Sequence, residues 1–539
     1  MRKETSPSRC GAAAAAVAGP SSGSVLQTTS KNPRRAQGPP LPRTGNAPYP
    51  LFPRKMQPIL PPMNAYSFLA RAAELWPSKV AVTARGESVT FGELLKRSEE
   101  LKHALFEAGI RPGVGLGLVA ANGPEFLVGL FAGLASGAVV MPISENLRPQ
   151  EVNRMLELVP LAGVLHEGSF SHDLPRSTET QRGRFSIAMR PREYHLKVAP
   201  GVPNAAVIRF TSGTTGSAKG VVLSHQTVFE RTEAAVEGLQ LSQGDAVLWV
   251  LPMAYHFVVS ILTYVRYGIA VVVPDGDSPE QLISSAQQHS PQMLYGAPAV
   301  VQSLINAPSG LSLPRSMRVV STSSCLYPQH ARTFEQRFGT SVEQLYGLFE
   351  VGLPLGSGLV SGGDGASVGR ALPRYEAAIL DPAGQQLPAG HMGSLAVRGP
   401  GMFDAYLAPY RPAADALLHG WFLTGDLAVQ SYDGSITVKG REKSVINVAG
   451  NKVFPEEVEG VINSYPGIQA SRVYGLEHTQ SGEMVVAEAV PQQGASIDVT
   501  ALATYLSEKL SRYKLPSALR LVDSIERTDS GKIRRVAQG

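Results

Sequence analysis

Apolar segments with the two-residue period of strands alternate along this chain with segments of helical period, from Tyr66 onward. Such alternation is typical of parallel sheets that are covered by helices. The sequence therefore predicts an α/β fold whose large N-terminal body consists of such sheets. Helices are expected at 68–75, 91–108 and 124–136, and strands at 80–83, 114–119, 138–142, 205–211, 246–251, 269–274, 293–295 and 319–322.

Short strands and tight turns replace this pattern after about Gly356. Strands are expected at 375–380, 393–398 and 435–438, and they predict a smaller β-rich subdomain within the body. A chain of 539 residues is too long for one core. We expect the body to cover residues 64–442, and a small α+β lid domain, joined by a hinge, to cover residues 443–539.

The first 55 residues are rich in Ala, Pro, Ser and Arg and carry no apolar period long enough to fold. They indicate a disordered leader, either an organelle transit peptide or an over-extended gene start. Residues 1–56 hold nine Lys/Arg and one acid, which leaves 40 bases and 43 acids in the rest of the chain. A nucleic-acid-binding body, which needs a dense basic face, is therefore not expected.

Two widely separated cysteines, Cys10 and Cys325, exclude a disulfide framework and lack the companions of a zinc site. They fit a reducing cytoplasm. The longest apolar stretch, residues 246–265, is interrupted by Pro252 and His256. It predicts a buried strand followed by a buried helix, so no integral membrane segment is expected.

The segment TSGTTGSAKG, residues 211–220, follows an apolar strand and combines three glycines, five hydroxyl residues and one lysine. Glycines let the backbone N–H groups approach a polyphosphate, hydroxyls add donors and the lysine adds a charge. The Walker ending Gly-Lys-Ser/Thr is absent. We expect a triphosphate cradle made of Thr211, Ser212, Gly213, Thr214, Thr215, Gly216 and Lys219.

This segment resembles the phosphate-binding signature of the adenylate-forming superfamily, which includes acyl-CoA synthetases, luciferases and the adenylation domains of peptide synthetases. Further segments match in the same order: YGLFE at 346–350, GWFLTGDLA at 420–428, GREKSVINVAGNKVFPEEVE at 440–459 and RTDSGKIRR at 527–535. The resemblance covers roughly residues 66–535 and is closest to the acyl-CoA ligase branch. It implies an enzyme that uses ATP and Mg2+ to activate a carboxylic acid.

The resemblance also implies roles for residues of the nucleotide site. Tyr346, beside Gly347, would stack on adenine, and Asp426 would accept hydrogen bonds from the ribose hydroxyls. Arg441 would contact the ribose. Glu350, expected on the same turn as Tyr346, would hold the Mg2+ together with Thr214, since Mg2+ prefers a carboxylate plus phosphate oxygens.

Lys532 is expected to swing onto the carboxylate and the α-phosphate, where charge develops during attack. Together with Lys219 and Glu350 it forms the expected catalytic set. Lys443 lies where the resemblance places the interdomain hinge. A hinge absorbs large backbone changes at a few residues, so this position should divide the body from a mobile lid. Gly450 would line the path of the CoA pantetheine arm.

Three positions depart from the motifs: Phe349 stands where the motif has Thr, Ala218 where it has Pro, and Asn447 where it commonly has Lys. The missing hydroxyl at Phe349 is one that the family points at the reacting phosphate. A relative that binds nucleotide without catalysis is therefore an alternative.

The expected acyl pocket favours an uncharged tail. The stretch LPMAYHFVVS, residues 251–260, has no Asp for the ammonium of an α-amino acid, which would be buried unpaired. Fatty acids are favoured over aryl acids, and the thiol acceptor is expected to be CoA, with a separate acyl carrier protein as the alternative, since no carrier domain follows Lys532. The expected pocket residues are His256, Gly296, Ser324 and Gly347.

Overall fold

The computed structural model of the chain describes residues 63–168, 174, 177–211, 219–357, 367–479, 481–527 and 533. The predicted leader (1–55), the cradle residues Ser212, Gly213, Thr214, Thr215 and Gly216, and Lys532 lie outside the described residues.

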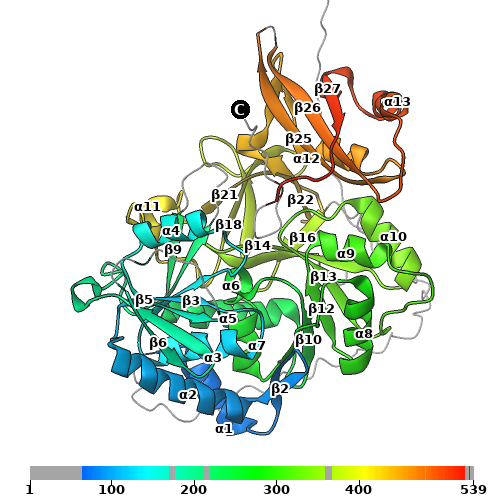
Figure 1. Cartoon of the computed structure of the whole chain (residues 1–539). Helices are drawn as coiled ribbons and strands as arrows, with labels where there is room; N and C mark the ends of the chain where they lie inside the picture. Colours follow the sequence, from blue (N-terminus) through cyan, green and yellow to red (C-terminus); the bar gives the residue numbers. More distant parts are fainter. Residues whose placement is uncertain are drawn as a thin grey trace, which may run out of the picture. The chain divides into compact units, whose positions relative to one another are not determined.

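Within the described residues, the first sheet has thirteen strands (Figure 1). Its strands from β14 to β1 pair in parallel, whereas the pairs from β14 through β15 to β17 are antiparallel. The strands of the predicted β-rich subdomain therefore extend the parallel sheet. In sheet order the strands are β17 Glu376–Leu380, β18 Met392–Arg398, β21 Phe422–Gln430, β22 Ile436–Arg441, β16 Ser367–Ala371, β15 Gly352–Gly356, β14 Val342–Leu348, β13 Arg318–Ser321, β12 Met293–Gly296, β10 Ala246–Trp249, β11 Ala270–Val272, β1 Val80–Ala84 and β2 Glu87–Thr90.

A second sheet, with nine strands among the described residues, has a parallel centre and antiparallel edges. Its strands in order are β20 Arg411–Pro412, β19 Ala405–Tyr406, β9 Lys219–Ser224, β8 Ala205–Thr211, β4 Val139–Ile143, β3 Gly115–Val119, β5 Leu161–Glu167, β7 Phe185–Met189 and β6 Thr178–Arg182.

Helices cover both sheets, as the alternation predicts. One hydrophobic core joins the two sheets through helices packed between them, and separate cores lie under the outer helices. Figure 1 shows α8, α9 and α10 beside the green strands β10, β12 and β13. The inner helices are α1 Ser67–Leu75, α2 Phe91–Ala108, α3 Pro124–Ala135, α5 His225–Leu239, α6 Met253–His256 and α7 Ile261–Tyr267, and the outer ones are α4 Pro149–Leu158, α8 Pro279–His289, α9 Pro298–Ile305 and α10 Pro328–Phe338.

Local signals set the ends of α2. The Thr90 side chain accepts from the Glu93 N–H while the Glu93 carboxylate accepts from the Thr90 N–H, which is a capping box. Gly109 ends the helix in the left-handed region, with φ of 107°. The predicted bounds, 91–108, are therefore those observed.

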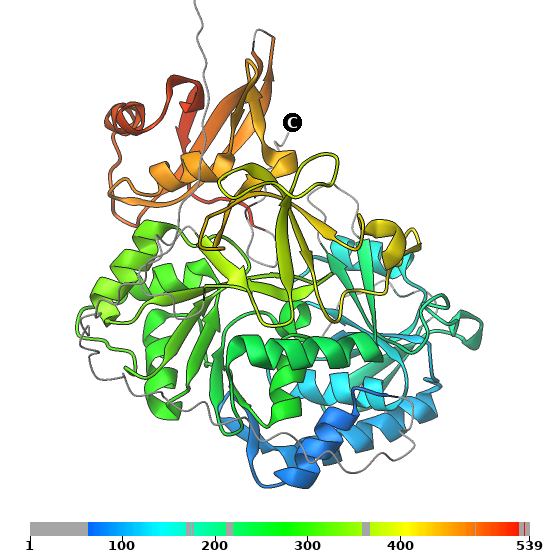
Figure 2. The ribbon, with the colours of Figure 1, turned by 180° about the vertical axis from the view of Figure 1, so that it is seen from behind.

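The C-terminal region forms a third sheet with its own hydrophobic core, built from residues between Ile446 and Leu510. Seen from behind in Figure 2, its strands are those drawn in orange to red. The predicted α+β pattern is thus present, while the division of the chain at residue 443 stays a prediction. Its elements are β23 Ile446–Val448, β24 Asn451–Val453, α12 Pro455–Ile462, β25 Ile468–His478, β26 Gly482–Pro491, α13 Val499–Lys509 and β27 Ala518–Leu521.

The apolar stretch 246–265 folds as strand β10 followed by the short helices α6 and α7, and its side chains are largely buried. Among the helices of the described residues, none combines the length and the apolar character needed to cross a bilayer.

Candidate functional site

The glycine-rich segment is bounded by a pair of antiparallel strands. Strand β8 ends at Thr211 and β9 begins at Lys219, and these two residues are partners in the ladder. The segment therefore starts and ends at one position of the second sheet. The contacts predicted for residues 212–216 stay predictions, because these residues lie outside the described ones.

Three residues connect the start of β9 to the turn after β14, and we call them the lysine cluster: Lys219, Tyr406 and Glu350. The Lys219 Nζ lies 4.9 Å from the centroid of the Tyr406 ring. The Tyr406 hydroxyl donates to Glu350 Oε1 at 3.4 Å. Burial and the charge of Glu350 raise the pKa of Tyr406, so its hydroxyl stays a donor at neutral pH.

Glu350 is held by a buried arginine on helix α5. Arg231 donates to three backbone carbonyls: Nη1 to Phe349 at 2.6 Å, Nη2 to Glu350 at 3.2 Å and Nε to Gly401 at 2.9 Å. Burial lowers the pKa of Arg231 to about 10, so it remains charged at pH 7. These bonds fix the backbone of the turn and leave the Glu350 carboxylate for other contacts.

A second group, the carboxylate cluster, joins Tyr346 of β14, Asp426 of β21 and Arg441 of β22. The Tyr346 hydroxyl donates to Asp426 Oδ2, and Arg441 Nε lies 2.8 Å from Asp426 Oδ1. Arg441 Nη1 also donates to the carbonyl of Thr424 at 2.9 Å. Burial first, and then the negative charge of Asp426, raise the pKa of Tyr346 well above its ordinary value. The tyrosine is therefore a permanent donor to this carboxylate.

Strand pairing explains this arrangement. Asp426 and Arg441 are direct partners across β21 and β22, so their side chains share one face of the sheet. The Asp426 side chain is 6% exposed and that of Arg441 is 32% exposed. A carboxylate offers about four acceptor positions, so Asp426 can accept from several donors at once.

The two clusters share one segment of chain. Tyr346 lies within β14 and Glu350 in the turn between β14 and β15. The expectation that both lie on one turn is wrong, because β14 continues to Leu348 through an irregularity in its pairing with β15. The strand ends before Glu350, so the two side chains belong to the two ends of this segment.

The structure describes all four expected acyl residues. His256 ends α6, and its Nε2 lies 3.5 Å from the Ser323 hydroxyl. Ser323 has φ of 75°, so the chain turns sharply there and leaves Ser324 exposed. Gly296 ends β12, and its carbonyl accepts from the N–H of Thr322 at 2.9 Å.

Glycine is required by space at two of these positions. A Cβ at Gly296 would lie 3.1 Å from Val250 Cγ2, and one at Gly347 would lie 3.0 Å from the Gly352 carbonyl oxygen. Both approaches are tighter than ordinary van der Waals contact. Larger side chains at these positions would displace their neighbours.

Lys443 and Gly450 belong to neither cluster. Lys443 is exposed in the short 3-10 helix η2, Glu442–Ser444, which lies between β22 and β23. Gly450 has φ of 85° and no atom within 4 Å of where its Cβ would be. Both geometries suit a position between elements and neither identifies a ligand.

The described residues contain no group of three or more His, Cys, Asp and Glu that could hold a metal by themselves. Glu350 supplies the one carboxylate of the lysine cluster. That donor set fits Mg2+, which proteins often bind through one or two carboxylates plus substrate phosphates.

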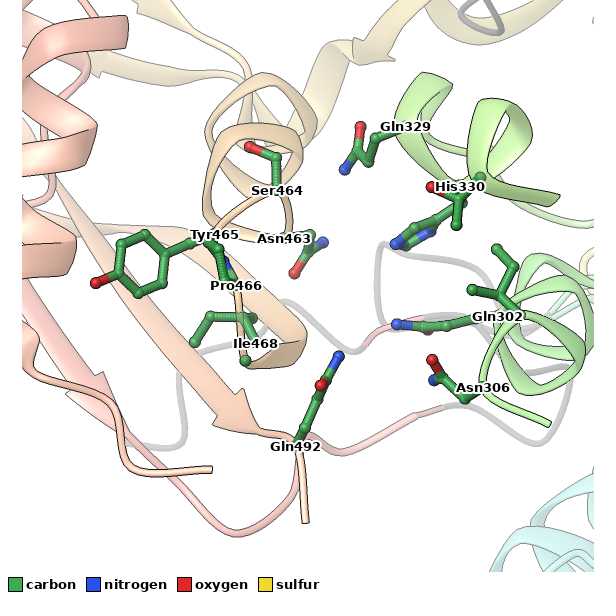
Figure 3. A pocket seen from close by; sticks show the side chains of 13 residues that line it. Gln302, Asn306, Gln329, His330, Asn463, Ser464, Tyr465, Pro466, Ile468 and Gln492 are labelled. Carbon is green, nitrogen blue, oxygen red and sulfur yellow. The ribbon is translucent and has the colours of Figure 1, made fainter. Parts of the chain in front are cut away.

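A cavity of about 250 Å³ lies elsewhere, between helices α9 and α10 and the C-terminal region (Figure 3). Five side-chain amides contribute to its wall, and Figure 3 shows Gln302 and Gln329 on one side and Asn463 on the other. Gln302 Nε2 donates to the Gln469 carbonyl at 2.7 Å and Gln329 Nε2 to the Gly460 carbonyl at 3.3 Å. No residue of the two clusters lines this cavity.

Sequence reasoning missed Arg231, Tyr406 and Arg209 of strand β8. Arg209 lies beside Phe349, with its guanidinium carbon 4.9 Å from the ring centroid. One signal could have found it, namely a charged residue in the otherwise apolar strand AAVIRFT directly before the glycine-rich segment. Arg231 and Tyr406 give no such signal, because only packing places them at Glu350.

Comparison with known proteins agrees with this geometry. The AMP-binding enzyme model matches residues 69–407, and the model of the AMP-binding enzyme C-terminal domain matches residues 457–532. The chain is 28% identical over 501 residues to the indoleacetate–CoA ligase of Aromatoleum aromaticum, covering 88% of this chain and 97% of the relative. It is 27% identical over 490 residues to the fatty acid–[acyl-carrier-protein] ligase ScoC of Streptomyces coeruleorubidus, covering 85% and 92%.

The fold is that of ATP-bound MatB from Rhodopseudomonas palustris, with a TM-score of 0.74 and 24% identity over 88% of this chain and 97% of that one. The C-terminal model match ends at Lys532, so the matched region reaches the terminal lysine motif. The first model alone matches more than half of the chain. This protein belongs to the AMP-binding enzyme family, in its acyl-CoA ligase branch, and is an AMP-forming acid–thiol ligase.

Proposed function

We propose that this enzyme activates a fatty acid as its acyl-adenylate and then transfers the acyl group to CoA. In the first step a carboxylate oxygen attacks the α-phosphorus of ATP, and pyrophosphate leaves. In the second step the CoA sulfur attacks the acyl carbonyl and AMP leaves, with the thiol proton passing to solvent. The observation that carries the proposal is that one segment, β14 and its turn, holds Tyr346 at the carboxylate cluster and Glu350 at the lysine cluster.

The carboxylate cluster suits the nucleoside end of ATP. Tyr346 and Glu350 are four residues apart, hence at most about 13 Å along an extended backbone, a separation that a nucleoside triphosphate can bridge. Tyr346 presents its ring to adenine, beside Gly347. Asp426, oriented by its two donors, accepts from the ribose hydroxyls, and Arg441 contacts the ribose.

The lysine cluster suits the phosphate end. Lys219 is exposed at the start of β9 and neutralises phosphate charge, with Thr211, Ser212, Gly213, Thr214, Thr215 and Gly216 as the rest of the cradle. Glu350, with Thr214, would hold Mg2+, which supplies charge neutralisation on the phosphates when it is bound. Arg231 keeps the Glu350 backbone in place through its carbonyl bonds.

A fatty acid is the proposed substrate because the stretch from Leu251 to Ser260 offers no carboxylate for an ammonium group. His256 and the small residues Gly296, Ser324 and Gly347 would line the pocket. The fatty-acid ligase ScoC supports this choice, while the indoleacetate–CoA ligase favours an aryl acid as the second candidate. The name of ScoC gives an acyl carrier protein as its acceptor, so a carrier protein is the alternative to CoA as the acceptor here.

In the second step, CoA has to reach the acyl-adenylate, so a different face of the C-terminal region has to lie against it. We propose that residues 443–539 act as a lid that rotates about Lys443, and that Gly450 then lines the path of CoA. The separate core between Ile446 and Leu510 supports a rigid unit after this point. The amide contacts of Gln302 and Gln329 would have to break in such a rotation. We place the enzyme in the cytoplasm on its cysteine usage.

Acid-dependent pyrophosphate release tests the proposal. Purified protein is incubated with Mg-ATP and decanoate, hexadecanoate, indoleacetate or benzoate, with and without CoA. We expect release with the alkyl acids and acyl-CoA only when CoA is present. Release with aryl acids alone would overturn the fatty-acid assignment, and no release with any acid would overturn the function itself.

Lys532→Ala separates the two steps. Lys532 is proposed to stabilise the charge that develops at the carboxylate and the α-phosphate, so its loss should slow adenylation about 100-fold or more. Thioester formation from supplied acyl-AMP and CoA should change little. Equal loss in both steps would contradict the assigned role.

A further inference from the structure

Arg209 is a partly buried cation without a hydrogen-bonding partner among the residues that the structure describes. It lies near the end of β8, two residues before the glycine-rich segment. Its Nε is buried and donates to no acceptor in that part of the chain. No carboxylate within the described ranges forms an ion pair with its guanidinium. Its contacts are with two rings: the guanidinium carbon lies 5.1 Å from the Tyr255 ring centroid and 4.9 Å from that of Phe349.

Arg231 has a different environment. Both guanidiniums lie near the Phe349 ring, at 4.9 Å and 5.7 Å. Arg231 donates to the carbonyls of Phe349, Glu350 and Gly401. Among the described residues, the Arg209 guanidinium instead contacts only the faces of two aromatic rings. Burial lowers the pKa of Arg209 to about 10, and its largest opposing influences are Tyr255 and Glu350. The group is therefore charged at pH 7, and ring contacts replace its lost hydration only in part.

The surroundings of Arg209 indicate which ligand it meets. Tyr255 precedes His256, the residue assigned to the acyl side, and Phe349 precedes Glu350, the residue assigned to the phosphate side. Arg209 thus lies between the two ends of the proposed reaction. Phe349 itself offers no hydroxyl to an anion, but its ring lies against the guanidinium of Arg209, whose Nε has no acceptor among the described residues.

We propose that Arg209 binds the oxyanion at the reacting centre, and that Phe349 and Tyr255 position its guanidinium for this contact. The ligand chemistry is a planar or tetrahedral oxyanion, which a guanidinium grips through paired N–H groups. Two sources share that chemistry, the carboxylate of the acid and the α-phosphate of ATP. This inference rests on the proposed function for its location, and its test is a binding measurement that does not need turnover.

The test compares dissociation constants of the wild type and Arg209→Met, measured by titration calorimetry. Mg-ATP is titrated without acid, and decanoate is titrated in the presence of AMP. Because charge-assisted donors are lost, we expect one constant to rise about 10-fold to 100-fold. A rise for decanoate alone assigns the carboxylate, and a rise for Mg-ATP alone assigns the phosphate.

Arg190, the residue directly after strand β7, provides a matched control. Arg190 also has a buried Nε without a hydrogen-bond acceptor and lies on a ring, with its guanidinium carbon 3.7 Å from the Tyr194 centroid. Arg190→Met should leave both constants within about twofold. Equal losses in the two variants would show a general effect of removing a buried cation and would overturn the proposal.

Two further variants test the role of the paired donors. Arg209→Lys retains charge but not the paired donors, so it should recover less than half of the lost binding energy. Arg209→Ala should regain binding when guanidinium chloride is added at millimolar concentrations, which a purely structural arginine would not show. Wild-type constants in a folded Arg209→Met, absent binding of both ligands to the wild type, or failure of all three variants to fold would each overturn it.

Discussion

The two clusters differ in how far the protein itself satisfies their charges. In the carboxylate cluster, Asp426 receives a tyrosine hydroxyl and an arginine, and it is only 6% exposed. In the lysine cluster and its neighbourhood, the described residues give the Glu350 side chain one long hydrogen bond, from Tyr406, and give Arg209 ring contacts only.

This difference separates recognition from chemistry. A group that is fixed by the protein's own donors offers a preorganised surface to a neutral sugar, which changes little during reaction. A charged group with few protein partners can interact strongly with a ligand whose charge changes during the reaction. We therefore expect substitutions in the carboxylate cluster to change stability and ATP binding, and substitutions at Glu350 to change the rate.

The largest effect is expected for Glu350→Gln. Acid-dependent pyrophosphate release should fall about 100-fold or more, because a charge that faces the phosphates is lost. The unfolding temperature should change little, since the 3.4 Å bond from Tyr406 is the side chain's only hydrogen bond within the described part of the chain. Tyr406→Phe, which removes that bond and keeps the ring beside Lys219, is the control and should retain most activity. A fully active Glu350→Gln would remove the contrast between the clusters.

Asp426→Asn should act first on stability and ATP affinity. It leaves Arg441 without its anion, which we estimate to cost about 2 kcal/mol, less than for a fully buried pair because Arg441 is 32% exposed. The KM for ATP should rise on the order of 10-fold to 100-fold, while kcat changes less. Thermal unfolding and ATP titration measure the two effects. The exposed pair of Asp433 and Arg370 supplies a control, since Asp433→Asn should change neither.

Tyr346→Phe should have a smaller effect of the same kind. The ring remains, and one hydrogen bond to a carboxylate is lost, about 1.5 kcal/mol or roughly 10-fold in the KM for ATP. The raised pKa of Tyr346 keeps its hydroxyl protonated through the neutral range, so the wild-type KM for ATP should not follow this group between pH 6 and 9. A drop in kcat larger than the rise in KM would place Tyr346 with the reacting groups instead.

His225 should affect stability without affecting either cluster. Burial lowers its pKa to about 4, and its Nδ1 accepts from the Ala65 N–H at 3.1 Å. In the unfolded chain this histidine has an ordinary pKa near 6.5, so between pH 6.5 and 4 it binds a proton that it does not bind in the folded chain. The free energy of unfolding therefore falls as the pH drops from 6.5 towards 4.

The expected loss is about 2 kcal/mol at pH 5 relative to pH 7. Urea midpoints at the two pH values measure it, and His225→Gln should reduce the difference while the activity of the folded enzyme at pH 7 stays unchanged. An unchanged pH difference in this variant would show that other groups carry it.

The elements of the fold were predictable where local chemistry sets them. The bounds of α2 follow from Thr90, Glu93 and Gly109, and β8 follows from its apolar run. The predicted α/β architecture is confirmed by the fold and by the family. The join of the β-rich strands to the parallel sheet was not predictable, because β14 reverses into β15 through pairing that the sequence does not specify.

The site was predictable where motifs name residues, and not where packing brings them together. Asp426 and Tyr346 are 80 positions apart, and only the resemblance connects them before the structure does. Arg231 has the sequence context of an ordinary helix residue, yet three carbonyls surround it. Ser323 lies beside His256 and takes a positive φ, and no local pattern indicated either feature.

The ladder pairing of Thr211 with Lys219 has a consequence for engineering. Since the two residues face each other across β8 and β9, any insertion between them starts and ends at points that the ladder already joins. Lengthening a connection of this kind costs little, about 0.6 kcal/mol for each doubling of its length. Variants with longer or shorter loops should therefore keep Lys219 anchored in β9, so that loop length and lysine position can be varied independently in one scaffold.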